Sequence, residues 1–82
     1  MTILIVEDNL VCAKLVEGLL QKAGYQTLLV NNGKEALELL PTLCDIHLVI
    51  TDYLMPEMNG IELIQQLKML PGLKDIPSII LS

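Results

Sequence analysis

Ile3-Leu4-Ile5-Val6 is an uninterrupted run of aliphatic residues, and the acidic pair Glu7-Asp8 follows it at once. Continuous apolar runs of this length are typical of strands that are covered on both faces. Two charged side chains cannot continue such a strand into the interior, because charged groups are almost never fully buried without a partner. The stretch therefore predicts a buried strand with two carboxylates at its carboxyl end.

Beyond this strand the sequence alternates between helical and extended patterns. Apolar residues at positions 11, 12, 15, 16, 19, 20 and 23 share one face of a helix that starts after Asn9 and stops at Gly24. The other expected elements are a strand over 25–30, a helix from Asn32 to Pro41, a strand over 46–51, a helix that begins after Asn59 and is broken by Pro71, and a strand over 78–82. This β-α-β-α-β-α-β order, with short connections, predicts an α/β fold in which helices cover both faces of a parallel sheet.

The composition is that of one small globular domain and disfavours several classes of partner. Of the 82 residues, 52% are hydrophobic, whereas disordered chains combine low hydrophobicity with high net charge. The net charge is −5 and arginine is absent, so these residues offer no basic surface to nucleic acid. The apolar runs are too short to span a bilayer, and no secretory leader precedes the first strand. We therefore expect a cytoplasmic protein that binds neither nucleic acid nor membranes, with Cys12 and Cys44 as reduced thiols.

Polar side chains follow three of the expected strands. Glu7 and Asp8 end the first, Asp52 ends the third and Ser82 ends the fourth. Because the carboxyl ends of parallel strands meet at one edge of the sheet, these side chains should converge. Crowded carboxylates raise the cost of ionising one another, and a hard cation with oxygen ligands, such as Mg²⁺, relieves that cost. Each acid alone is explained as well by a helix cap or a solvated loop end, but the three together favour a magnesium site.

A magnesium site of this kind points to phosphoryl chemistry, since the metal can bridge a carboxylate and phosphate oxygens. The nucleophile could be water, a substrate hydroxyl, or one of the carboxylates, which would give an aspartyl phosphate. Neither a GxxxxGKS/T loop nor a GxGxxG fingerprint is present to bind a nucleotide. A magnesium-dependent phosphohydrolase is disfavoured, because Asp8 is followed by Asn9 and Leu10 rather than by the second aspartate of a DxDxT pair.

Three segments together resemble the receiver domains of two-component response regulators. Residues 3–9 are similar to the opening strand and acidic pair of that family. The block Asp52-Tyr53-Leu54-Met55-Pro56-Glu57-Met58-Asn59-Gly60 closely resembles its phospho-acceptor segment, Asp-x-x-Met-Pro followed by Asn/Asp-Gly. Residues 77–82 look like its fourth strand, which ends in Thr or Ser. The resemblance implies a flavodoxin-like, doubly wound parallel sheet with strand order 2-1-3-4.

The resemblance also implies a role for each site residue. Asp52 would accept the phosphoryl group and contribute to the metal site, Asp8 would ligate Mg²⁺ directly, and Glu7 would do so directly or through water. The backbone carbonyl of Leu54 would supply another ligand, and the hydroxyl of Ser82 would bond a phosphoryl oxygen. The phosphoryl donor would be a phosphohistidine on a sensor histidine kinase or a phosphotransfer protein. The chain would not be an enzyme beyond catalysing its own phosphorylation and dephosphorylation.

Against that family, residues 1–82 correspond to a partial receiver domain. The fourth helix, the fifth strand with its phosphate-pairing lysine, and the fifth helix have no counterpart, and neither Lys68 nor Lys74 is placed to substitute. The alternative function is therefore a receiver-like interaction or scaffold module without phosphotransfer. An uncovered strand edge and uncovered apolar surface also lead us to expect self-association or a domain swap with a second copy.

Overall fold

The computed structural model describes residues 1–43, 45–55, 57–73 and 75–81. Strands and helices alternate along them, as the sequence predicts. The elements are β1 (Thr2–Val6), α1 (Leu10–Lys22), β2 (Gln26–Val30), α2 (Gly33–Leu39), the short 3-10 helix η1 (Leu40–Thr42), β3 (Ile46–Asp52), α3 (Gly60–Lys68) and β4 (Ser78–Leu81). None of the helices in these ranges is long and apolar enough to cross a membrane.

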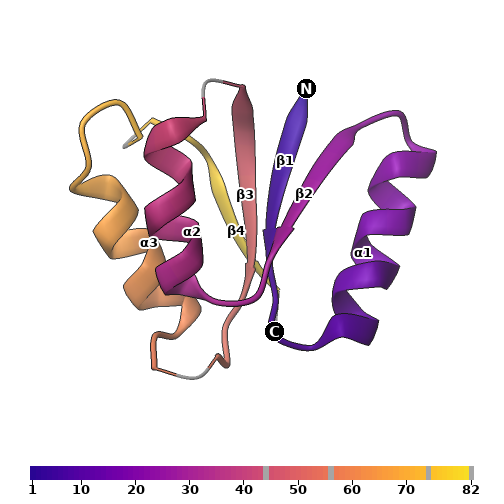
Figure 1. The fold of residues 1–82 in the computed structure, drawn as a ribbon, viewed down its shortest axis with the longest axis horizontal. Coiled ribbons are helices and arrows are strands. Elements are labelled where there is room, and N and C mark those ends of the chain that lie inside the picture. The colour runs from indigo at the N-terminus through magenta and orange to yellow at the C-terminus, as the bar shows by residue number, and fades with distance from the viewer. Residues whose placement is uncertain (44, 56, 74, 82) are drawn as a thin grey trace.

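The four strands form one parallel sheet in the order β2-β1-β3-β4. β1 and β3 are therefore the central strands, and helices lie on both sides of the sheet. Figure 1 shows α1 on one side, with α2 and α3 together on the other. The predicted flavodoxin-like architecture and its strand order 2-1-3-4 are confirmed.

The central strand β1 supplies side chains to the core on both faces of the sheet. Ile3 and Ile5 pack with Ile50 of β3 on the α1 side. Leu4 and Val6 belong to the larger cluster on the α2 and α3 side. All four β1 side chains are at most 2% exposed. Because successive side chains of a strand point to opposite faces, an unbroken apolar run is what a strand between two layers requires.

The helix face predicted for α1 is only partly correct. Val16 and Leu20 pack against the sheet, and Ala13 is the buried residue of the helix. Val11, Leu15 and Leu19 are instead 64–71% exposed. At 100° per residue, Val11, Leu15 and Leu19 lie on the side of the helix away from Ala13. The wide apolar stripe therefore has one edge against the sheet and the other edge in solvent.

Asparagine residues cap α1, α2 and α3, the helices that the sequence predicts to start at these positions. The side chains of Asn9, Asn32 and Asn59 accept hydrogen bonds from the third residue of the following helix at 2.8–3.1 Å. At α3 the Glu62 carboxylate also accepts from the Asn59 backbone N–H at 3.0 Å, which completes a capping box. The helix ends are less accurate: Pro41 lies within η1 rather than ending the second helix, and α3 stops at Lys68. A proline is tolerated there because the first turn of a helix does not need its N–H.

Candidate metal centre

The three predicted acidic side chains converge at the carboxyl ends of the two central strands. Glu7 and Asp8 directly follow β1, and Asp52 is the last residue of its neighbour β3. Each carboxyl group offers an oxygen that lies within 4.8 Å of the oxygens offered by the other two. Residues 45 positions apart in the sequence therefore form one cluster, at the end of the sheet where β1 runs into α1 (Figure 1).

The turn from β1 into α1 is fixed by hydrogen bonds on both sides of the acidic pair. The Glu7 backbone N–H donates to the Val30 carbonyl at 3.1 Å, which continues the pairing of β1 with β2. The Glu7 carboxylate accepts from the Asn9 backbone N–H at 3.0 Å. Asn9 in turn caps α1. One hydrogen-bonded turn therefore holds Glu7 and Asp8 at the rim.

The electrostatics of the cluster favour a bound cation. Partial burial, which removes water from the carboxylate, raises the pKa of Glu7, and the neighbouring Asp8 and Asp52 raise this pKa further. The hydrogen bond from Asn9 acts in the opposite direction. A cation placed among the three carboxylates would remove their mutual repulsion. The cluster therefore has the electrostatics of a cation site.

The donor set fits magnesium. Carboxylate oxygens are hard ligands, and two oxygens bound to one Mg²⁺ at about 2.1 Å lie at most about 4.2 Å apart. The three carboxylate oxygens lie within 4.8 Å of one another, which is close to that value. Small side-chain rotations would therefore bring them to ligand distance from one ion.

Backbone contacts also hold Asp52 in place. Its Oδ1 accepts a hydrogen bond from the Tyr53 backbone N–H at 2.9 Å. The same N–H lies 3.2 Å from the Leu81 carbonyl of β4. The Tyr53 carbonyl accepts from the Gly60 backbone N–H at 2.9 Å, which ties the start of α3 to the end of β3. The Asp52 carboxylate therefore extends from a backbone segment that is hydrogen-bonded to β4 and to the start of α3.

Two of the other predicted site residues are not placed by the structure as ligands. Leu54 lies two residues beyond Asp52, with its side chain 74% exposed, and the role of its backbone carbonyl stays a prediction. Ser82 lies outside the described residues, as does Pro56 of the acceptor motif. The geometric evidence for the site therefore rests on the three carboxylates.

Two small residues beside the cluster matter more than the sequence suggests. A Cβ atom on Gly60 would lie 2.6 Å from the Asp52 carbonyl oxygen, so this position leaves no room for a side chain. Thr51 was not predicted to have a role, yet it is fully buried and its hydroxyl donates to the same carbonyl oxygen at 3.0 Å. The available signal was a hydroxyl at the end of the apolar run Leu48-Val49-Ile50, directly before Asp52.

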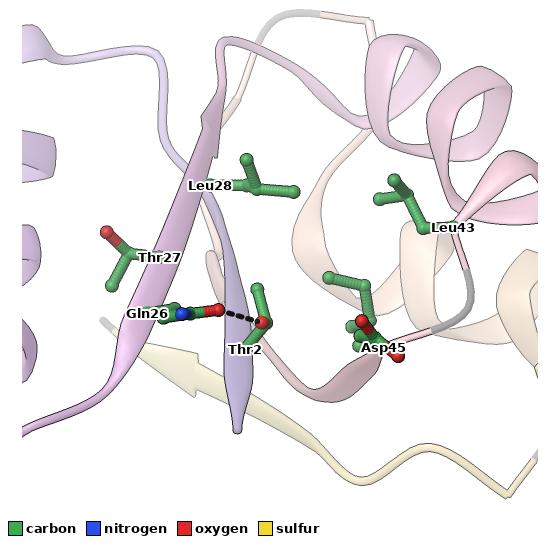
Figure 2. Close-up of a pocket in the computed structure, with 7 residues that line it drawn as sticks. Thr2, Gln26, Thr27, Leu28, Leu43 and Asp45 are labelled. Carbon is green, nitrogen blue, oxygen red and sulfur yellow. Dashed lines mark hydrogen bonds between the residues drawn. The ribbon is translucent and has the colours of Figure 1, made fainter.

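A cavity of about 390 Å³ lies at the opposite end of the sheet, away from the carboxylates. Leu28 and Leu43 point toward each other across it, and the Thr2 hydroxyl donates to the Gln26 side chain at 3.2 Å beside it (Figure 2). Its lining includes none of the three clustered acids. The cavity is therefore separate from the candidate metal centre.

Comparisons with known proteins agree with this geometry. Residues 3–82 match the family model of the response regulator receiver domain. The chain is 39% identical over 80 residues to the two-component response regulator ORR3 of rice (Oryza sativa subsp. indica), which covers 98% of this chain and 61% of the relative. The chain thus spans about three fifths of the length of that relative.

Solved structures show the same fold. The signal receiver domain of a signal transduction histidine kinase from Syntrophus aciditrophicus superposes with a TM-score of 0.91 at 46% identity, over 99% of this chain and 61% of that one. A response regulator receiver protein from Pseudomonas putida gives a TM-score of 0.92 at 26% identity, over 99% of this chain and 66% of that one. The sequence match, the strand order and the acidic cluster all lead to one conclusion: this chain belongs to the response regulator receiver domain family.

Proposed function

We propose that the chain is the phospho-accepting switch of a two-component phosphorelay, with Asp52 as the acceptor and Mg²⁺ held by Glu7, Asp8 and Asp52. The observation that carries the proposal is the meeting of three carboxylate oxygens within 4.8 Å at the rim of the sheet. Membership of the receiver family supports it, since receiver domains are the phospho-accepting parts of response regulators.

The proposed step transfers one phosphoryl group. A carboxylate oxygen of Asp52 attacks the phosphorus atom of a phosphohistidine, and the new O–P bond forms as the P–N bond breaks. The imidazole leaves and takes up a proton. Mg²⁺ supplies positive charge that offsets the charge on the transferring oxygens.

The chain contributes orientation to this step. The Tyr53 N–H holds Oδ1 of Asp52 at 2.9 Å, so the carboxylate does not rotate freely. Glu7 and Asp8 are held by the turn into α1 and supply the remaining carboxylate ligands, and the Leu54 carbonyl is the further ligand that we propose. The change at Asp52 from one negative charge to roughly two is large enough to bias nearby loops between two arrangements. Acting on itself in this way, the chain is a switch rather than an enzyme with external turnover.

The partners follow from the same chemistry. We propose that a sensor histidine kinase or a phosphotransfer protein supplies the phosphohistidine, and that the meeting takes place in the cytoplasm. A second copy of the chain is a further proposed partner, because Leu15 and Leu19 of α1 and Ile79 and Leu81 of β4 are 42–71% exposed. Light scattering at increasing dilution tests this partner, and a folded monomer throughout would rule it out.

The test of the function uses acetyl phosphate, Mg²⁺ and intact-mass measurement. We expect a labile adduct of one phosphoryl group that is lost in Asp52→Asn and on removal of Mg²⁺. Asp45→Asn is the matched control, because Asp45 is an exposed carboxylate beside the distant cavity, and it should form the adduct normally.

Two results would contradict the proposal. Steady release of phosphate without an adduct would indicate a hydrolase. A folded chain that gains no phosphoryl group would instead support the interaction or scaffold module, whether or not it binds Mg²⁺.

A further inference from the structure

The peptide group between Asp52 and Tyr53 is held at both of its polar atoms. Its oxygen accepts a hydrogen bond from the Thr51 hydroxyl at 3.0 Å. Its N–H donates to Asp52 Oδ1 at 2.9 Å and lies 3.2 Å from the Leu81 carbonyl. A peptide group is planar, so its oxygen and its N–H cannot turn independently. Whatever fixes the oxygen therefore also sets the direction of the N–H toward the carboxylate.

Thr51 is well placed to fix that oxygen. It lies in the central strand β3, in register with Val6 of β1 and Ile80 of β4. It is the polar residue among the buried side chains that the structure describes, with an exposure of 0%. A hydroxyl has one proton to donate, and the other nearby acceptor, the Met55 sulfur at 3.9 Å, is a weak one. The hydroxyl therefore bonds the carbonyl of the next residue, where the strand ends.

Gly60 bounds the same oxygen from another side. A Cβ at this position would lie 2.6 Å from the Asp52 oxygen and 3.3 Å from Thr51 Cγ2. The oxygen thus occupies a narrow space between a hydroxyl that attracts it and a glycine that leaves room for it. A side chain at Gly60 would turn the peptide plane, and loss of the hydroxyl would release it.

We propose that Thr51 is a positioning residue for the acceptor: its hydroxyl fixes the plane of the Asp52–Tyr53 peptide and so aims the Tyr53 N–H at the Asp52 carboxylate. The inference rests on the proposed function, because it takes Asp52 to be the phosphoryl acceptor. The Thr51 hydroxyl bonds the backbone oxygen of Asp52 rather than its carboxylate, so it acts on the acceptor through the backbone.

The first test does not need phosphorylation. Amide hydrogen exchange is measured by NMR for the wild type, for Thr51→Val, which removes the hydroxyl at nearly the same size, and for Thr51→Ser, which keeps the hydroxyl. We expect Thr51→Val to lower the protection of the Tyr53 amide by about tenfold, the effect of one lost hydrogen bond, and Thr51→Ser to restore it. The amides of Val49 and Ile50 in the same strand should change little.

The second test measures the phosphorylation rate with acetyl phosphate and Mg²⁺. We expect Thr51→Val to lower the maximal rate by about tenfold while the half-saturating concentration of acetyl phosphate stays unchanged, because the carboxylate is misaimed rather than the donor poorly bound. Thr51→Ser should recover most of the rate. If Thr51 only stabilised the fold, its loss would not lower the maximal rate while leaving the half-saturating concentration of acetyl phosphate unchanged.

The outcomes separate the two proposals. A wild type that forms no adduct overturns the proposed function, while the exchange measurement still decides whether Thr51 sets the peptide plane. Equal loss of protection at Tyr53 and Val49, or no loss at either, overturns the inference. If Thr51→Val does not fold, Gly60→Ala displaces the same oxygen from the other side and should show the same selective loss at Tyr53. Retained protection in that variant also overturns the inference.

Discussion

Replacing glycine by alanine at two helical positions should change the stability of this chain in opposite directions. Gly18 lies inside α1, where an added Cβ would have no atom within 4 Å apart from the backbone of the helix itself. Gly60 is the first residue of α3, where the same Cβ would lie 2.6 Å from the Asp52 carbonyl oxygen. The two substitutions are chemically identical, so the surroundings alone decide the difference.

The magnitudes follow from these contacts. At Gly18 the helix gains the preference of alanine over glycine, and we expect about 0.8–1.0 kcal/mol of added stability. At Gly60 the Cβ must move about 0.7 Å to reach the roughly 3.3 Å at which carbon and oxygen normally meet. The obstructing atom belongs to the backbone of β3, so it can give way only if the Asp52–Tyr53 peptide plane turns. Such overpacking costs about 1–3 kcal/mol, and after the helical gain we expect a net loss of up to about 2 kcal/mol.

Urea unfolding followed by far-ultraviolet circular dichroism measures both variants against the wild type. If the unfolding free energy falls by about 1 kcal/mol per molar urea, the midpoint should fall by up to about 2 M for Gly60→Ala and rise by about 0.8–1.0 M for Gly18→Ala. Unchanged slopes would show that the variants alter stability rather than the extent of unfolding. If Gly60→Ala is as stable as Gly18→Ala, the close approach of α3 to the end of β3 is not the reason for this glycine.

Three further predictions concern the core, a helix cap and the acidic cluster. Leu63→Ala removes a fully buried side chain of α3 and should lower the free energy of unfolding, measured in urea, by about 2–5 kcal/mol. Ile61→Ala, at a position 46% exposed, should lower it by well under half of that amount. Similar losses in the two variants would contradict the difference in burial. Asn59→Ala breaks the capping box and should lower stability by about 1 kcal/mol in thermal unfolding, so an unchanged melting temperature would count against the cap. In Mg²⁺-free buffer, the raised pKa of Glu7, due first to desolvation, means that the folded chain holds this proton more tightly than the unfolded chain. The contribution of Glu7 to the free energy of unfolding is therefore fully present below the ordinary pKa of a glutamate, and it is lost as the pH rises through the raised pKa. Urea unfolding across this range should show the decline in the wild type and a flatter profile in Glu7→Gln, and parallel profiles would refute the assignment.

Local patterns in the sequence were sufficient to predict the elements, their order and the family. The apolar run of residues 3–6 is long enough to identify a strand covered on both faces, and an asparagine that caps the helix stands directly before each of α1, α2 and α3. The convergence of Glu7, Asp8 and Asp52 could also be predicted, because all parallel strands present their carboxyl ends at one edge of the sheet. These features depend on residues near one another in the chain, or on a general rule of topology.

Only the tertiary structure decided which side chains meet. The apolar stripe of α1 is wider than the surface it covers, so periodicity could not tell that Leu20 packs on the sheet while Leu19 is 71% exposed. The pattern likewise could not show that one carbonyl oxygen accepts from the Thr51 hydroxyl and excludes a Cβ at Gly60, because that arrangement depends on how closely α3 approaches the end of β3. Periodicity records the preference of each residue for the interior, whereas such distances are set by the packing of whole elements against one another.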